Sequence, residues 1–113
     1  MRIVFVDDSK DLVEVMRVLV QQLLRCEVRT ARSGLEALSV IRDFSPHIAF
    51  IDLVMPGMCG MDVARTVKLE PSPPKLVAFS GLNTEEAALR AGFDSFLLKP
   101  ASMRLILDEC QVN

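Results

Sequence analysis

Short apolar runs alternate with longer amphipathic stretches from one end of the chain to the other, and this alternation restricts the fold more than any other feature. Five runs have the length of β-strands, at residues 3–6, 27–30, 47–51, 76–79 and 93–98. The third and fourth are almost entirely apolar, which is typical of parallel strands covered by helices on both faces. The pattern therefore predicts an α/β domain with a five-stranded parallel sheet.

The stretches that separate the first three strands have helical periodicity. The first of them is expected to bury one face, which consists of Leu12, Met16, Leu19, Val20 and Leu23. The second is expected to bury a face that consists of Ala37, Leu38, Ile41 and Phe44. Pro46 follows directly and should end this second helix, because proline cannot continue a helix.

Three further helices are expected in the second half of the chain. One carries Val63, Ala64 and Val67 and should end at the proline-rich residues 71–74. The next should begin with a capping box, in which the Asn83 side chain and Glu86 satisfy free backbone N–H groups, and should stop at Gly92. The last is short and is built around Met103, Ile106, Leu107 and Cys110.

Chain length and composition indicate a single domain over residues 1–113. A chain of 113 residues, half of them hydrophobic and a quarter charged, has the composition of one globular core. The three cysteines, Cys26, Cys59 and Cys110, are odd in number and widely spaced, which predicts neither a disulfide framework nor a zinc site. A Met1 directly before the first strand slightly favours a stand-alone domain over one excised from a longer regulator.

Charge and hydropathy exclude two classes of partner. The formal net charge is −2 and the basic residues are scattered, so direct binding of nucleic acid is not expected. Asp7 and Asp8 interrupt the first apolar run, which rules out a signal peptide, and the sequence contains no apolar stretch of the ~20 residues that a membrane span needs. The expected location is the cytoplasm, and the expected partners are proteins.

Chemically active side chains follow four of the five predicted strands. Asp7 and Asp8 follow the first strand, Asp52 the third, Ser80 the fourth and Lys99 the fifth. Ligand sites of parallel α/β sheets lie beyond the carboxyl ends of the strands. The sequence therefore predicts that three carboxylates, a hydroxyl and an ammonium group converge on one rim of the sheet.

Three neighbouring carboxylates repel one another, and either protonation or a bound cation must relieve that repulsion. Mg²⁺ suits the site because it prefers oxygen ligands and keeps several water molecules. A carboxylate beside such an ion can act as a nucleophile on phosphorus and form an aspartyl phosphate. Lys99 would then neutralise charge on the transferring oxygens, and the Ser80 hydroxyl would donate a hydrogen bond to them.

The motifs at the predicted strand ends resemble those of the receiver domains of two-component response regulators. They are V-D-D at residues 6–8, F-I-D-L-V-M-P-G at 50–57, F-S-G at 79–81 and L-L-K-P at 97–100. The resemblance covers essentially the whole chain and keeps the order of the motifs. It implies a flavodoxin-like, doubly wound (βα)5 fold and a phosphorylation-dependent signalling switch in place of a conventional enzyme.

Matched position by position, the resemblance also implies the roles of individual residues. Asp52 would be phosphorylated, Asp8 would bind Mg²⁺ directly, and Asp7 would bind it largely through water. The backbone carbonyl of Val54 would complete the protein's share of the metal ligands. Lys99 would bind the phosphoryl group, and its bond to Pro100 is expected to be cis.

The implied switch involves Ser80 and Phe96, which occupy the family's hydroxyl and aromatic switch positions. A sensor histidine kinase or a histidine phosphotransfer protein would supply the phosphoryl group. The output would be a downstream protein target or a homodimer formed through the fourth helix, fifth strand and last helix. Val54 and Leu82 are apolar where the family influences attack by water, which predicts slow dephosphorylation.

Four other interpretations compete with this one. Asp7 and Asp8 are equally suited, in isolation, to the cap and first turn of a helix. A haloacid dehalogenase-like phosphatase would need a D-x-D pattern after the first strand and a cap domain, and this chain has neither. A pseudo-receiver would not need Asp8, Asp52, Ser80 and Lys99 together. A flavodoxin-like cofactor binder would have a phosphate loop rich in Ser, Thr and Gly.

Overall fold

The most completely buried strand lies at the centre of the sheet. In β3 (Ile48–Asp52) every residue is buried, and the strand pairs in parallel with β1 (Arg2–Val6) on one side and β4 (Lys75–Ser80) on the other. The computed structural model describes residues 1–111. β2 (Glu27–Ala31) and β5 (Ser95–Leu98) form the edges, so the strand order is β2-β1-β3-β4-β5. This arrangement confirms the predicted parallel sheet and flavodoxin-like α/β fold.

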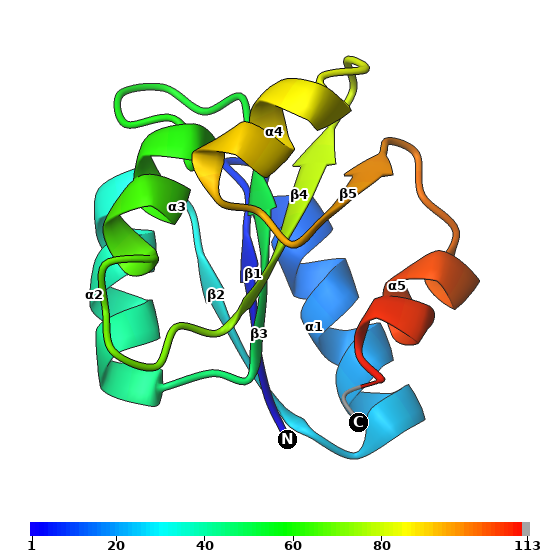
Figure 1. Cartoon of the computed structure of the whole chain (residues 1–113). Helices are drawn as coiled ribbons and strands as arrows, with labels where there is room; N and C mark the ends of the chain where they lie inside the picture. The colour runs from blue at the N-terminus through cyan, green and yellow to red at the C-terminus, as the bar shows by residue number, and fades with distance from the viewer. Residues whose placement is uncertain (112–113) are drawn as a thin grey trace.

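Helices cover both faces of this sheet (Figure 1). They are α1 (Lys10–Leu24), α2 (Gly34–Phe44), α3 (Gly60–Val67), α4 (Glu85–Ala91) and α5 (Met103–Glu109). α2, α3 and α4 share one apolar cluster with alternate residues of the strands, and α1 and α5 share a second cluster on the opposite face. Figure 1 shows α2 and α3 on one side of the sheet and α1 and α5 on the other.

The predicted inner face of α1 is only partly correct. Val13 and Val20 are the fully buried residues of this helix, and Val13 was not among those expected. Leu19 and Leu23 are instead 39% and 55% exposed. α1 carries apolar residues on two sides, so periodicity alone does not determine which side faces the sheet.

Apart from one-residue shifts at the ends of β1 to β4, the other elements differ from the predictions in three places. α3 ends at Val67, well before Pro71, and the chain continues through a turn in which the Glu70 N–H bonds to the Val67 carbonyl. The cap of α4 is Thr84, without a side-chain capping bond, so the predicted Asn83 capping box is wrong. β5 begins at Ser95, because Gly92 at φ 112° ends α4 and the Phe93 N–H still bonds to a carbonyl of that helix.

The N-terminal caps of α2 and α3 differ in their side-chain hydrogen bonds. Cys59 has the extended backbone of an N-cap but makes no side-chain capping bond, whereas Ser33 caps α2 by accepting from the Glu36 N–H. Cys59→Ser should therefore raise the free energy of unfolding by about 0.5–1 kcal/mol, and Ser33→Ala should lower it by about 1 kcal/mol. Urea midpoints measure both changes, and an unchanged Cys59→Ser midpoint would count against the capping explanation.

Candidate functional site

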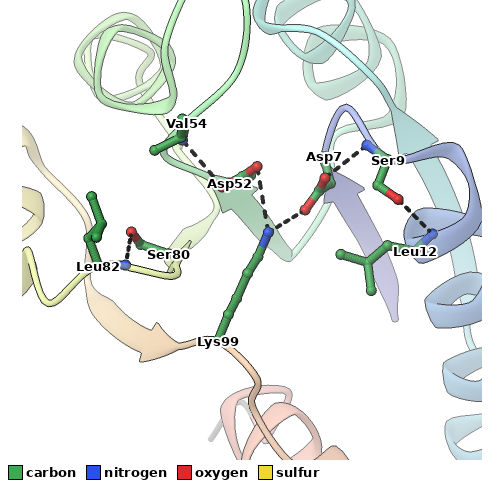
Figure 2. A network of polar contacts seen from close by, with 8 residues as sticks. All are labelled: Asp7, Ser9, Leu12, Asp52, Val54, Ser80, Leu82 and Lys99. Atoms are coloured by element: carbon green, nitrogen blue, oxygen red, sulfur yellow. Dashed lines mark hydrogen bonds and ion pairs between the residues drawn. The ribbon is translucent and has the colours of Figure 1, made fainter.

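The carboxyl ends of β1, β3, β4 and β5 place the expected side chains along one rim of the sheet (Figure 2). The register brings Asp52 beside Phe79 and Ser80 beside Leu98, so the last residues of three neighbouring strands lie close together. Lys99 directly follows β5, and its backbone N–H bonds to the Ser80 carbonyl at 2.7 Å. In Figure 2 its side chain extends between Asp52 and Asp7.

Asp52 is a buried carboxylate at the end of the central strand. Its Oδ1 accepts a hydrogen bond from the Val54 N–H at 3.2 Å, and its Oδ2 lies 3.5 Å from the Lys99 ammonium. Burial raises the pKa of Asp52; the Val54 N–H opposes that rise, the charge of Asp7 adds to it, and Lys99 opposes it. A positive ion added beside Asp52 would therefore stabilise its charged form.

Gly60 allows the first turn of α3 to press against the backbone of this strand end. A Cβ atom at residue 60 would lie 2.4 Å from the Asp52 carbonyl oxygen and 3.0 Å from Leu53 Cα. Both neighbours are backbone atoms that cannot move aside, so only glycine fits. The close approach fixes the Asp52 peptide. The requirement for glycine at residue 60 was not predicted from the sequence.

Asp7 and Asp8 differ in their surroundings. Asp7 is 6% exposed; its Oδ1 accepts from the Ser9 N–H at 2.9 Å and its Oδ2 accepts from Lys99 at 2.7 Å. Asp8 is exposed. Ser9 is the cap of α1, since its hydroxyl accepts from the Leu12 N–H. The capping interpretation of the two aspartates is therefore wrong, although a serine before the first apolar helical residue is a recognisable capping signal.

Lys99 is the positive charge of the rim. Burial disfavours its charged form, but the hydrogen bond to Asp7 and the charges of Asp52 and Asp7 outweigh that effect and raise the pKa of Lys99. The ammonium lies closer to Asp7, at 2.7 Å, than to Asp52, at 3.5 Å. Lys99 is thus shared between the two buried carboxylates.

The carboxylates form a group that suits a hard cation. Asp7, Asp8 and Asp52 each offer an oxygen, and these oxygens lie within 4.8 Å of one another. Three carboxylates and one ammonium leave a net charge of −2 at the rim. An all-oxygen donor set with excess negative charge matches the preferences of Mg²⁺, so the residues fit a metal site of this kind.

Ser80 and Phe96 lie further along the rim. The Ser80 side chain is 1% exposed, and its hydroxyl accepts a hydrogen bond from the Leu82 N–H at 3.0 Å, without a contact to Asp52. Phe96 is half-buried against the cluster beneath α2, α3 and α4. Val54 and Leu82 both have side chains that are 65% exposed beside the rim. The Lys99–Pro100 peptide bond is cis, as expected.

Family and structure comparisons agree with this geometry. The family model for the response regulator receiver domain matches residues 3–111. A protein-glutamate methylesterase/protein-glutamine glutaminase of Myxococcus xanthus is 35% identical over 107 residues, which are 90% of this chain and 31% of the relative. The DNA-binding response regulator MtrA of Mycobacterium tuberculosis is 30% identical over 104 residues, which are 88% of this chain and 44% of that protein. The chain thus spans less than half the length of these curated relatives.

Solved receiver domains have the same fold. A signal receiver domain from Bermanella marisrubri superposes with a TM-score of 0.83 at 30% identity, covering 96% of this chain and 93% of that one. The response regulator domain of CheB from Thermotoga maritima superposes with a TM-score of 0.81 at 25% identity, covering 97% and 90%. In the part of the chain that the structure describes, no helix combines the length and apolarity needed to cross a membrane.

Proposed function

The chain belongs to the response regulator receiver domain family, and we propose that it is a switch in which Asp52 accepts a phosphoryl group from a histidine kinase or a histidine phosphotransfer protein. The observation that carries the proposal is the convergence of Asp7, Asp8 and Asp52 around Lys99 at one rim of the sheet. A receiver domain is a phosphorylation-dependent switch of two-component signalling and not a conventional enzyme. Residues 1–113 are proposed to act as one such domain.

The proposed chemistry follows from the contacts at the rim. A carboxylate oxygen of Asp52 attacks phosphorus while the bond to the donor nitrogen breaks, and the bonding electrons leave with the imidazole. Asp7, Asp8, Asp52 and the Val54 carbonyl would hold Mg²⁺, which would neutralise charge on the transferring oxygens. Lys99 moves from the carboxylates to the phosphoryl group, and Ser80 exchanges its bond with the Leu82 N–H for one that it donates to a phosphoryl oxygen.

The proposal is tested by intact mass after incubation with acetyl phosphate and Mg²⁺. The chain should gain one phosphoryl group, which hydroxylamine removes, and Asp52→Asn should gain none. The variant should remain folded: because the folded-state pKa of Asp52 is raised, the stability that this carboxyl contributes is lost as pH rises through that pKa. A neutral Asn should therefore cost no stability at pH 7, which a thermal unfolding control checks. Equal labelling of Asp52→Asn would refute the assignment.

The phosphorylated form should be long-lived. Val54 and Leu82 are exposed apolar side chains beside the rim, and neither can orient a water molecule by hydrogen bonding. Val54→Asn combined with Leu82→Glu should speed dephosphorylation roughly tenfold or more, below the ~10²–10⁴-fold of full general base catalysis. Leu35→Glu, at an exposed position of α2, is the matched control and should leave the dephosphorylation rate unchanged. A decay rate that stays the same in the double variant would contradict the explanation.

The proposed output surface is the face formed by α4, β5 and α5. Leu89, Leu98 and Leu105 lie on these three elements and are 46%, 50% and 48% exposed. Phe96 is half-buried on the same edge strand, so its rotation would alter this surface. The face is suited to a protein target or to a second copy of the chain, with the cytoplasm as the proposed location.

A further inference from the structure

A cavity of about 380 Å³ lies next to the phosphoryl site, between α1 and the connection from β5 to α5. Its size is within the range of about 300–1,000 Å³ that is usual for small-molecule sites. Pro100 and Ala101 line it on the β5–α5 side, and Leu12 and Met16 line it on the α1 side. Of the aromatic residues that line it, Phe79 is partly exposed, whereas Phe5 and Phe50 are 3% and 1% exposed.

Three aromatic rings from neighbouring strands line the sheet side of this cavity, and Phe79 is the one that is partly exposed. Phe5 and Phe50 stack with ring centroids 4.8 Å apart and planes 13° apart. Phe79 lies 6.0 Å from Phe50 at a tilt of 48°. The partly exposed Phe79 ring favours a flat aromatic molecule, because aromatic rings gain from offset or tilted packing in addition to burial.

Asp7 and Lys99 are the charged residues that line the cavity, and both belong to the phosphoryl site. They are paired at 2.7 Å, and Asp8 and Asp52 lie beside them, so this end of the cavity carries a net charge of −2. An anionic ligand would be repelled there. A cationic group would be attracted, and Asp7 Oδ2 is the acceptor that it would reach.

We propose that this cavity binds a small aromatic amine, with its ring system against Phe79, Leu12 and Met16 and its protonated amine at Asp7. The ligand ammonium takes the place of Lys99 on Asp7, and Lys99 keeps its pairing with Asp52. Binding itself does not depend on the proposed phosphorylation, but its regulatory consequence rests on the proposed function.

That consequence is antagonism between the amine and the divalent cation. Both place positive charge at Asp7, so each should weaken the binding of the other by the same factor. The amine would therefore favour the metal-free state and reduce phosphorylation of Asp52. The site would make the receiver responsive to a small molecule in addition to its kinase.

The test uses three probes that share a naphthalene ring and differ in charge. They are 2-naphthylmethylamine, which is a cation, 2-naphthalenemethanol, which is neutral, and the carboxylate anion of 2-naphthaleneacetic acid. Isothermal titration of the full chain should show the tightest binding for the amine and the weakest for the acetate. Saturating Mg²⁺ should weaken amine binding by about fivefold or more, the lower end of common coupling between sites. Equal binding of the three probes, or amine binding that Mg²⁺ leaves unchanged, overturns the proposal.

Two variants locate the probe. Ala101→Leu should fill the cavity mouth and weaken amine binding about tenfold. This is the change in affinity expected when the ligand ring loses about two aromatic contacts. Ala87→Leu, on the exposed side of α4, is the matched control and should bind normally. Leu12→Phe provides a second filling variant if Ala101→Leu unfolds, and normal binding to a folded filling variant refutes the location. Labelling by acetyl phosphate without any probe distinguishes the amine-site proposal from the proposed phospho-acceptor function. If labelling fails, the phospho-acceptor function is refuted and the amine site is unaffected.

Discussion

Removing the divalent cation should abolish phosphoryl labelling of this chain. The rim carries three carboxylates against one ammonium, so an anionic phosphoryl donor meets a net charge of −2 at Asp52. That net charge already includes Lys99, which is shared between Asp7 and Asp52. We expect labelling by acetyl phosphate to fall at least about 100-fold when the cation is chelated, the usual scale for losing one main electrostatic contribution to a transition state.

The two flanking aspartates should differ in this experiment. Asp8→Ala should impair labelling more than Asp7→Ala, because Asp8 is exposed and free to bind the cation directly, whereas Asp7 already accepts from Ser9 and Lys99. Asp11→Ala, an exposed acid in the first turn of α1, is the control and should label normally. Full labelling in excess chelator, or an Asp7→Ala defect larger than that of Asp8→Ala, would contradict the proposed metal ligands.

Ser80→Ala should permit phosphorylation but remove most of the conformational response. The Ser80 hydroxyl is buried and is bonded to the Leu82 N–H, and its carbonyl accepts from the Lys99 N–H. A hydroxyl drawn toward a phosphoryl oxygen would shift the start of the loop after β4 and allow Phe96 to turn inward. Without the hydroxyl, that attraction is lost while Asp52 and Lys99 remain in place.

NMR of the Phe96 ring with and without beryllofluoride measures this response. The wild-type ring signals should shift, those of Ser80→Ala should shift far less, and Ser39→Ala on the exposed side of α2 should behave as wild type. Residue 96 is Phe and has no hydroxyl, so it cannot make the hydrogen bond by which a tyrosine would hold the inward state. We therefore also expect some active-like population before phosphorylation. Fixed Phe96 signals in a wild-type chain whose partner still distinguishes the two forms would place signalling on another face.

The sequence was sufficient to predict which residues meet at the rim. Parallel strands end at one edge of a sheet, so locating the apolar runs before Asp7, Asp52 and Lys99 was enough to bring these side chains together. The metal-suited cluster and the pairing of Lys99 with both buried carboxylates agree with that expectation. The roles of Ser80 and Phe96 stay predictions.

Features that depend on packing in three dimensions could not be predicted in this way. The rotation of α1 that buries Val13 and exposes Leu23 depends on tertiary contacts, since both sides of the helix are apolar. The need for glycine at residue 60 arises from a backbone segment eight residues away in sequence, and no local turn signal encodes it. The cavity lined by α1 and the β5–α5 connection joins residues from four separate segments of the chain, so it is a property of the packed molecule.

The most direct measurement is to locate the phosphoryl group by peptide mass spectrometry after borohydride reduction, which converts an aspartyl phosphate to homoserine. The chain would be phosphorylated with acetyl phosphate and Mg²⁺, reduced and digested. We expect homoserine at residue 52 and at no other aspartate, with none when Mg²⁺ is left out. Homoserine at residue 7 or 8, or a phosphorylated chain without homoserine at residue 52, would show that Asp52 is not the phospho-acceptor.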